Sequence, residues 1–570
     1  MYGFIGVVGK AMIREVSTEF PGRDLNGVVF DYGVITHDDV TVKRKTISRF
    51  MKDKVWFEDD RYIIASEGVI LNLADLMLRY ESTCADELII RMIDRNGYDF
   101  IKELNGNFSI AVIDKRSKDI CLLTSHFAFR PLYYAILNGQ VLFSTDISWM
   151  YNNLGNAEEP ELDMDGAYLA LTAGFMYDNK TLVKKVKKVV SGEYVIISGQ
   201  QERRVTYWDI NAIKENTRDY EETIDIAEDL FSKAVKRCFE KDIEYGFNHI
   251  CTLSGGLDSR SVVMVADDLG YKKKMLVSFC EHGQTDGEVA SEIAAHLNNE
   301  HILYDLDNGI CFFDIEKIVR INGGLICWRG ASPTERICEL INFSSFGLLH
   351  GGDIGDAMFG GSFEDYNNEN WDLTQKTYSN RLIDRLSDGF KTDIKNRYKT
   401  GKIFCIYNRG VNANENGYLA SNLVTETTSA FMDKEFAEFI LSVPSKYLIN
   451  SRLYIDWMKK YHPEMCLFIW AKNMTKPGAK KTVELKNRVI RRFRKVVLKK
   501  SVSMNPFEAW YADGKHMKLQ FDEAFESMID LITDSRLKTD CTSLYREGSI
   551  YEKMQVLSLL AAIKVFRIHA

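Results

Sequence analysis

The stretch that most constrains this chain is HICTLSGGLDSRSVVMVADDLG, residues 249–270. A run of β-forming residues meets Ser254-Gly255-Gly256, and helical spacing of apolar residues follows at once. A strand that turns directly into a helix presents unpaired backbone N–H groups and the positive end of the helix dipole at one point, which suits a phosphate. The sequence therefore predicts a phosphate-binding turn between a strand and a helix.

The individual residues of this turn refine the prediction. Two glycines let the backbone approach an anion closely, and Ser254 and Ser259 add hydroxyl donors. A carboxylate at Asp258 would repel phosphate unless a cation lies between them, which implies Mg²⁺. The alternative is an ordinary tight turn in which Asp258 caps the helix.

The turn does not follow the patterns of the common nucleotide-binding loops. GxxxxGK[ST] and GxGxxG are both absent, and no lysine stands where a Walker loop would reach a γ-phosphate. This favours a site that grips pyrophosphate over one that transfers the terminal phosphoryl group.

The surrounding sequence divides into two parts. Residues 1 to about 205 contain short apolar runs such as RYIIASEGVIL and NFSIAVIDK between Gly, Asn and Asp turns, which predicts packed β-sheets. From about residue 210, strands alternate with helices, which predicts a parallel sheet wrapped by helices. With 570 residues, we expect two domains, at 1–209 and 210–570, the second with a helical and basic C-terminal part.

Composition excludes several classes of protein. A net charge of −8 and a pI near 5.8 disfavour a general nucleic-acid-coating protein. Eleven cysteines without metal-ligand spacing favour reduced thiols in the cytoplasm. The start MYGFIGVVGK is predicted to be a strand and not a signal peptide, and no stretch reaches the length of a membrane span.

At these motifs the chain resembles a known family. SGGLDS resembles the pyrophosphate-binding loop of N-type ATP pyrophosphatases, specifically asparagine synthetases of the B type with their β-lactam synthetase and lasso-peptide cyclase relatives. HGGDIGDAMFGG (350–361) and AFMDKEFAEFILSVP (430–444) are similar to two further family signatures. SEGVILNLADL, LNGNFSIAVID and FRPLYYAILNGQVLFSTDI resemble the family's class II glutamine amidotransferase domain, so the resemblance covers residue 1 to about 480.

The resemblance implies both a fold and a chemistry. The fold is an α+β Ntn-hydrolase-like sandwich followed by an α/β adenine-nucleotide α-hydrolase-like domain. The chemistry is ATP-dependent adenylation of a carboxylate, with release of pyrophosphate, followed by displacement of AMP by an amine. It assigns Mg²⁺ to Asp258 and Asp356, the phosphates to Ser254, Gly255, Gly256 and Ser259, and the adenosine pocket to Leu253, Phe279, Gly351 and Gly352.

Several positions depart from the family pattern. Asp353 stands where the family has a catalytic Glu that takes a proton from the amine, and its shorter side chain must lie about one methylene closer. Arg329 matches an Arg at the acyl-adenylate, although a surface Arg is an equal alternative, and Lys472 or Lys476 would balance the pyrophosphate charge. Two family threonines are replaced by Ile326 and Cys327, and a family Arg by Thr428, which argues against free aspartate as the substrate.

The glutaminase-like part is predicted to be inactive. Active domains of this type use an N-terminal Cys as the nucleophile, and Tyr2 stands in that place. Glu67 replaces an Asn that would stabilise an oxyanion, and a carboxylate there would repel it. We expect this domain to serve as a scaffold, to dock substrate or to close the synthetase site.

Three functions remain open from the sequence. The first is a ligase that joins a small-molecule or peptide carboxylate to ammonia or to a substrate amine. The others are an intramolecular cyclase and a non-catalytic nucleotide-binding scaffold. A homodimer is one compatible assembly, no nucleic-acid partner is expected, and the basic segment 472–500, with twelve Lys or Arg, is predicted to be a solvated helix.

Overall fold

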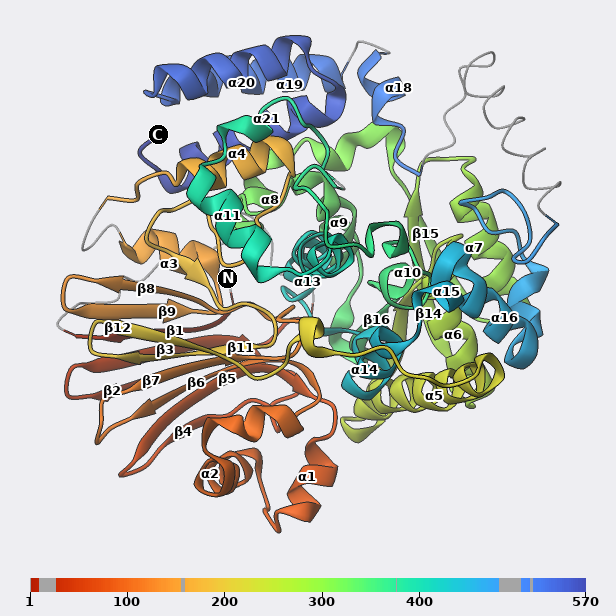
Figure 1. The fold of residues 1–570 in the computed structure, drawn as a ribbon, viewed down its shortest axis with the longest axis horizontal. Coiled ribbons are helices and arrows are strands. Elements are labelled where there is room, and N and C mark those ends of the chain that lie inside the picture. Colours follow the sequence, from red (N-terminus) through yellow and green to blue (C-terminus); the bar gives the residue numbers. More distant parts are fainter. Residues whose placement is uncertain (1, 10–26, 155–158, 376, 481–503, 513–515) are drawn as a thin grey trace.

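A computed structural model describes residues 2–9, 27–154, 159–375, 377–480, 504–512 and 516–570. The chain forms a β-sandwich followed by a helix-covered parallel sheet (Figure 1). The predicted basic helix falls mostly within 481–503, outside the described residues.

Two six-stranded sheets build the first half, and every strand pairing in them is antiparallel. The order β10-β8-β9-β1-β3-β2 comprises β1 (Gly3–Val8), β2 (Phe30–His37), β3 (Val40–Ile47), β8 (Tyr133–Leu137), β9 (Gln140–Ser144) and β10 (Lys187–Lys188). The order β12-β11-β7-β6-β5-β4 comprises β4 (Trp56–Glu58), β5 (Tyr62–Ile70), β6 (Gly106–Asp114), β7 (Ile120–Thr124), β11 (Glu193–Ser198) and β12 (Gln201–Thr206).

Apolar packing explains the layers of this half. One core cluster, which includes Phe4, Val42, Ile63 and Leu122, fills the space between the two sheets. The helices are α1 (Leu73–Arg79), α2 (Ala85–Asn96), α3 (Ile147–Leu154) and α4 (Met164–Thr172). Because α1 and α2 cover the outer face of the second sheet (Figure 1), β5 is buried at every position.

The second half is built on a parallel sheet with the order β15-β14-β13-β16-β17. Its strands are β13 (Asn248–Thr252), β14 (Lys274–Cys280), β15 (Glu300–Asp305), β16 (Phe346–Gly351) and β17 (Thr427–Ser429). The strand order reverses direction at β13 and β16, and the carboxyl ends of parallel strands at such a point are where ligands bind in open α/β sheets.

Helices surround this sheet. They are α5 (Tyr220–Glu244), α6 (Asp258–Asp268), α7 (Thr285–His296), α8 (Ile315–Asn322), α9 (Ser332–Leu340), α10 (Gly355–Met358), α11 (Asp388–Arg397), α12 (Gly401–Phe404), α13 (Glu415–Ser421), α14 (Lys434–Ser442), α15 (Ser445–Leu448) and α16 (Arg452–Tyr461). A 3₁₀ turn, η4 (Trp328–Gly330), and a π-helix, η8 (Cys405–Asn412), lie among them. The expected alternation of strands and helices after residue 210 is confirmed.

The last helices pack on elements of both halves of the chain. They are α18 (Phe507–Ala512), α19 (Met517–Met528), α20 (Ser535–Glu547) and α21 (Ile550–Phe566). A capping box between Ser549 and Glu552 starts α21, whose side chains are buried almost throughout. Since α21 packs on both α4 and α8, the C-terminal helix joins the sandwich side to the parallel-sheet side (Figure 1). No helix among the described residues has the length and apolar character of a membrane span.

Candidate functional site

The turn after β13 is held in shape by its own hydroxyl groups. The Ser254 backbone N–H donates to Ser259 Oγ at 3.0 Å, and the two serine hydroxyl oxygens lie 3.1 Å apart. The Gly256 N–H donates to Ser254 Oγ at 3.2 Å. The predicted strand, glycine turn and helix are all present in the predicted order.

Asp258 does not cap the helix that it begins. Leu257 occupies the N-cap position of α6, and no side-chain capping bond is present there. Instead, Asp258 Oδ2 accepts the backbone N–H of Asp356 at 2.9 Å, across the gap to the loop after β16. The capping alternative is therefore wrong, and the two predicted metal-binding aspartates lie at one place.

Charge accumulates at this pair of aspartates. Burial, and after it the charge of Asp356, raise the pKa of Asp258 well above its usual value, whereas hydrogen bonds from the Asp356 N–H and Tyr454 and the charge of Lys472 act in the opposite direction. The Asp356 carboxylate accepts the Ser362 hydroxyl at 2.6 Å. Within the described residues neither aspartate forms a salt bridge, and Lys472 is the cation whose charge acts on Asp258.

Glycines allow the two loops to approach so closely. A Cβ at Gly352 would collide with the Ser259 backbone nitrogen, and one at Gly355 would lie 2.6 Å from Asp258 Cγ. At Gly255 a Cβ would lie 2.8 Å from the Ala471 side chain. Side chains at these positions would push the aspartates apart, so the glycines are required by the packing of the site.

Arg260, a buried arginine that the sequence prediction missed, hydrogen-bonds to the backbone of the turn. Arg260 donates to the Gly255 carbonyl oxygen at 3.2 Å and to the Ile469 carbonyl oxygen at 2.7 Å. The Ala471 N–H also donates to the Gly255 carbonyl oxygen, at 3.1 Å. Through these bonds Arg260 and the turn hold the segment 469–471 in place. Lys472, the next residue, therefore lies beside the turn. The only sequence signal of Arg260 is its place two residues after Asp258.

The residues predicted to hold adenosine lie at the carboxyl ends of three neighbouring strands. Leu253 follows β13, Phe279 is the penultimate residue of β14, and Gly351 ends β16. Gly352 comes next, between Gly351 and Asp353. Their role in adenosine binding stays a prediction.

His350, beside these glycines, has a structural partner. Its Nε2 lies 2.7 Å from Asp242 Oδ2, and its ring stacks on Phe239 with the centroids 4.0 Å apart. His249 Nδ1 lies 2.8 Å from the same carboxylate oxygen. The three polar side chains tie α5 to the two central strands directly behind the site.

Asp353 lies on the second loop in contact with a tyrosine. Burial raises the pKa of Asp353 to about 6, and a hydrogen bond with Tyr418 acts in the opposite direction. The Ser429 hydroxyl donates to the Asp353 carbonyl oxygen at 3.0 Å. A carboxyl with a pKa near neutrality is suited to accept a proton. Tyr418 and Ser429 were not predicted, because nothing in their local sequence indicates this contact.

Arg329 is neither at the phosphate turn nor free on the surface. It belongs to η4 and stacks on Tyr378, with its guanidinium carbon 4.5 Å from the ring centroid. The Tyr551 ring is 5.0 Å away. Arg329 is half-buried, and no described contact links it to Asp258 or Asp356, so its role at the acyl-adenylate stays a prediction.

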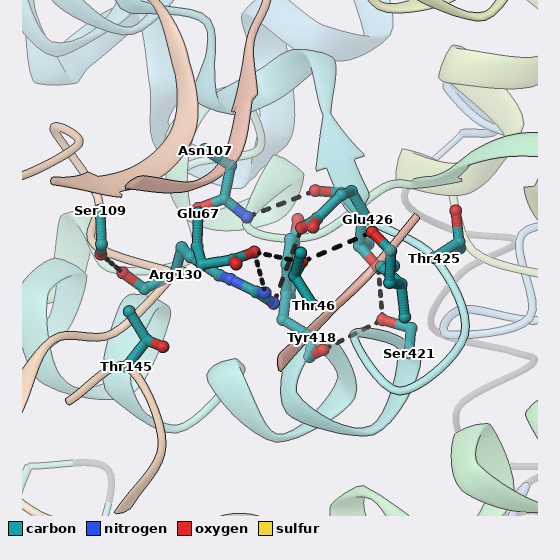
Figure 2. Close-up of polar contacts among 12 residues, drawn as sticks. Thr46, Glu67, Asn107, Ser109, Arg130, Thr145, Tyr418, Ser421, Thr425 and Glu426 are labelled. Atoms are coloured by element: carbon teal, nitrogen blue, oxygen red, sulfur yellow. Dashed lines mark hydrogen bonds and ion pairs between the residues drawn. The ribbon is translucent and has the colours of Figure 1, made fainter. Parts of the chain in front are cut away.

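A second cluster of charges lies between the two halves of the chain, and Figure 2 shows part of it. Lys54 Nζ is 3.4 Å from Glu67 Oε2 and 3.0 Å from Glu426 Oε1. The Arg130 guanidinium is 3.2 Å from Glu67 Oε2 and 3.6 Å from Glu426 Oε2. All four side chains are between 0% and 3% exposed, and Thr46 donates to Glu67 at 2.9 Å.

This cluster, Lys54–Glu67–Arg130–Glu426, is electrically balanced. Burial alone would raise the pKa of Glu426, but the charges of Arg130 and Lys54 outweigh it and lower that pKa. Glu426 directly precedes β17, and its carbonyl oxygen accepts the Leu349 N–H at 2.9 Å. Glu67, which we predicted to repel an oxyanion, thus has its charge neutralised by Lys54 and Arg130. Glu426, the second carboxylate of the cluster, belongs to the other half of the chain.

Tyr2 is packed into the same interface. Its ring stacks on Phe30 with the centroids 4.7 Å apart, and the side chain is 9% exposed. Burial raises the pKa of the Tyr2 phenol to about 12. A protonated, buried phenol is a poor nucleophile at neutral pH.

Comparisons with known families agree with this architecture. The glutamine amidotransferase domain family matches residues 45–208, and the asparagine synthase family matches residues 227–402. The first match lies on the sandwich and the second on the parallel-sheet half.

Curated relatives are distant. Asparagine synthetase [glutamine-hydrolyzing] 2 of Bacillus subtilis is 27% identical over 278 residues, 44% of this chain and 36% of that protein. A putative asparagine synthetase of Methanocaldococcus jannaschii is 23% identical over 57% of this chain and 64% of its own length. Amidase chyE of Penicillium rubens is 23% identical over 40% of this chain and 32% of its own length. The chain thus spans less than two thirds of each of these relatives.

Solved structures add little to this assignment. An allosteric regulatory enzyme of purine biosynthesis matches with a TM-score of 0.24 and 10% identity, over 53% of this chain and 74% of that one. A value this low carries no argument. The two family matches, in chain order on two halves of the expected architecture, are the finding that decides: the chain belongs to the asparagine synthase family and carries an N-terminal glutamine amidotransferase domain of the Ntn-like β-sandwich type.

Proposed function

We propose that this protein is an ATP- and Mg²⁺-dependent ligase that adenylates a carboxylate and then forms an amide bond. The observation that carries the proposal is the Asp258–Asp356 pair, uncompensated by any ion pair in the described part of the chain, beside a serine- and glycine-rich turn. Members of the asparagine synthase family use ATP. The proposed domains are 1–209 and 210–570, and the proposed location is the cytoplasm.

The reaction needs activation because a carboxylate is a poor electrophile. A carboxylate oxygen attacks the α-phosphorus of ATP, and the bond from that phosphorus to the pyrophosphate oxygen breaks. Negative charge develops on the leaving pyrophosphate, where backbone N–H groups of Gly255 and Gly256 and the hydroxyl of Ser259 would donate. Lys472, held beside the turn by Ala471, would add a positive charge.

Asp258 and Asp356 fit a magnesium ion. Both offer carboxylate oxygens, the ligand type that Mg²⁺ prefers, and burial, followed by the charge of Asp356, raises the pKa of Asp258. When bound, Mg²⁺ would neutralise phosphate charge as it develops. Ser362 and the Asp356 N–H orient the two carboxylates.

Asp353 is the proposed base of the second step. The amine nitrogen attacks the carbonyl carbon of the acyl-adenylate, the bond to the AMP oxygen breaks, and Asp353 takes the proton from the nitrogen. Its pKa of about 6 leaves it ionised at neutral pH and still basic enough to accept that proton. Leu253, Phe279, Gly351 and Gly352 are the proposed adenosine contacts.

We further propose that the amidotransferase domain no longer hydrolyses glutamine. Glu67, in the place of an oxyanion donor, is bound to Lys54 and Arg130, and Tyr2 is buried. The domain then has a structural role, because its Lys54 and Arg130 bind Glu426 next to β17. Ammonia from solution or an amine of the substrate would serve as the nucleophile.

An intramolecular cyclase is the second proposal within this chemistry. Loss of a glutaminase favours a nucleophile that the substrate itself carries. Ile326 and Cys327, which replace polar family residues, are buried and would favour an acid other than free aspartate. A non-catalytic scaffold is disfavoured, because nucleotide binding alone does not require two carboxylates as close as those of Asp258 and Asp356.

The test is the phosphorus-detected product pattern from ATP, Mg²⁺ and a panel of carboxylic acids, with ammonia compared to glutamine. AMP plus pyrophosphate with an acid and ammonia, but not with glutamine, is the expected result. ADP plus phosphate would refute adenylation. ATP binding without turnover on any acid would favour the scaffold.

A further inference from the structure

Tyr454, on α16, contacts both segments that carry the Asp258–Asp356 pair. Its hydroxyl hydrogen-bonds to the Asp258 carboxylate. Its ring stacks on Phe359, which directly follows α10, the helix of Asp356, with the centroids 4.6 Å apart. The side chain is 1% exposed, so packing and not solvent determines its position.

Aromatic neighbours hold the ring of Tyr454 from other directions. The centroid of Trp457 is 5.8 Å away, and that of Phe431 is 6.3 Å away in an edge-to-face arrangement. A Cβ at Gly355, the first residue of α10, would lie 2.8 Å from Phe431 Cε2. The aromatic packing therefore fixes the phenol oxygen relative to α10 as well as to α6.

The number of available protons gives the direction of the hydrogen bond to Asp258. The hydroxyl oxygens of Tyr454 and Ser261 lie 2.9 Å apart, and either could be the donor. An ionised carboxylate can only accept, so the single phenol proton points to Asp258 when that group is ionised. The Tyr454 oxygen can then accept from Ser261.

The Asp258 carboxylate keeps acceptor capacity beyond this bond. Its Oδ2 accepts the Asp356 N–H at 2.9 Å. With the phenol, this uses two of the roughly four lone-pair positions of a carboxylate. Two donors from separate segments fix the rotation of the carboxylate, and the remaining lone pairs are left for a cation.

We propose that Tyr454 is a positioning residue for the metal, which holds the Asp258 carboxylate and, through Phe359, the Asp356 segment in the arrangement that binds one divalent cation. The inference rests on the proposed function, because it takes the two aspartates as the metal site. Removing a hydrogen-bond partner of a metal ligand typically lowers metal affinity about tenfold to a hundredfold.

The test is a titration with Mn²⁺ in the presence of a non-hydrolysable ATP analogue, followed by electron paramagnetic resonance. Tyr454→Phe removes the hydroxyl and keeps the ring, so the Kd for Mn²⁺ should rise at least about tenfold. The line shape of the bound Mn²⁺ should also change, because its ligand geometry changes. Ser261→Ala leaves the phenol proton on Asp258 and should raise the Kd by less.

Tyr461→Phe is the matched control. Tyr461 ends the same helix, and its hydroxyl donates to Asp225 at 2.7 Å on the exposed side. The control thus loses an equivalent tyrosine–aspartate bond away from the site, and it should retain the wild-type Kd and line shape. Circular dichroism of each variant should match wild type. Wild-type affinity and line shape in Tyr454→Phe would overturn the proposal.

Asp258→Asn separates this inference from the proposed function. If Asp258→Asn loses Mn²⁺ and Tyr454→Phe does not, the positioning role is wrong and the metal site stands. If Asp258→Asn binds Mn²⁺ as well as wild type, the metal site is wrong and the positioning role with it. Weakened binding in both variants, with wild-type binding in Tyr461→Phe, is the expected pattern.

Discussion

Two pairs of carboxylates lie where distant segments of the chain meet, and the two pairs differ in whether salt bridges neutralise them. Glu67 and Glu426 share two cations, Lys54 and Arg130, in a buried and balanced cluster. Asp258 and Asp356 meet through a single backbone hydrogen bond, with no ion pair among the described residues.

The difference separates a structural cluster from a reactive one. Where charges are mutually neutralised and buried, the charges of Arg130 and Lys54 outweigh the effect of burial and lower the pKa of Glu426. Where two acids face each other, burial and mutual repulsion raise the pKa of Asp258, and a cation from outside would relieve both. The first pair joins the domains, and the second is the proposed metal site.

The largest effect should come from the Asp258–Asp356 pair. Asp258→Asn removes one of the two proposed metal-binding carboxylates, so pyrophosphate release should fall about a hundredfold to a thousandfold, as for the loss of an electrostatic contact to a transition state. The measurement is the initial rate of pyrophosphate release. Asp268→Asn, at the far end of the same helix, is the control and should stay near the wild-type rate. An unchanged rate in both Asp258→Asn and Asp356→Asn would defeat the site assignment.

Removing one carboxylate of the balanced Lys54–Glu67–Arg130–Glu426 cluster should lower the free energy of unfolding more than it changes the reaction rate. Glu426→Gln leaves Lys54 and Arg130 with a single carboxylate between them, and the free energy of unfolding should fall by about 3–5 kcal/mol. Denaturant titration gives this value. Glu435→Gln removes an exposed partner of Arg237 and should cost less than about 1 kcal/mol. Equal costs for the two substitutions would mean that the cluster does not hold the domains together.

Ionisation of a third carboxylate, Asp353, should make the rate of amide formation depend on pH. Its raised pKa means that it keeps its proton up to about pH 6, and a protonated Asp353 cannot accept a proton from the amine. At a constant concentration of unprotonated amine, the rate of amide formation in a single turnover should therefore fall about tenfold for each pH unit below 6 and level off above it. Asp353→Asn should be slow and lack this dependence. A wild-type profile that is flat between pH 5 and 7 would exclude Asp353 as the base.

The smallest effect tests how much the geometry of the cluster matters. Arg130→Lys keeps the charge between Glu67 and Glu426 but loses the fork that reaches both, so unfolding should become easier by about 1–2 kcal/mol. Denaturant titration at the same pH as for Glu426→Gln allows a direct comparison. A loss as large as that of Glu426→Gln would show that fork geometry, and not charge balance, stabilises the interface.

The sequence revealed the local features of the site better than its long-range ones. SGGLDS predicts a strand, a turn and a helix because all three depend on neighbouring residues, and the two loops with Asp258 and Asp356 do meet. Glu67 could be recognised as an unusual residue, but not its partners. Lys54, Arg130 and Glu426 lie on separate segments that only folding brings together.

The same limit applies to the residues that hold the site residues in place. Arg260 holds the turn through backbone carbonyl oxygens, which carry no sequence signature. Tyr418 reaches Asp353 from α13, a helix far along the chain. Contacts of this kind depend on tertiary packing, so residue spacing cannot predict them.

Binding of Mn²⁺ in the presence of a non-hydrolysable ATP analogue, detected by electron paramagnetic resonance, tests the central claim most directly. It reports metal capture by Asp258 and Asp356 without any knowledge of the acid substrate. The account predicts a protein-bound Mn²⁺–nucleotide complex in wild type and in Glu67→Gln, and its loss in Asp258→Asn and Asp356→Asn. Equal binding by wild type and both aspartate variants would contradict it.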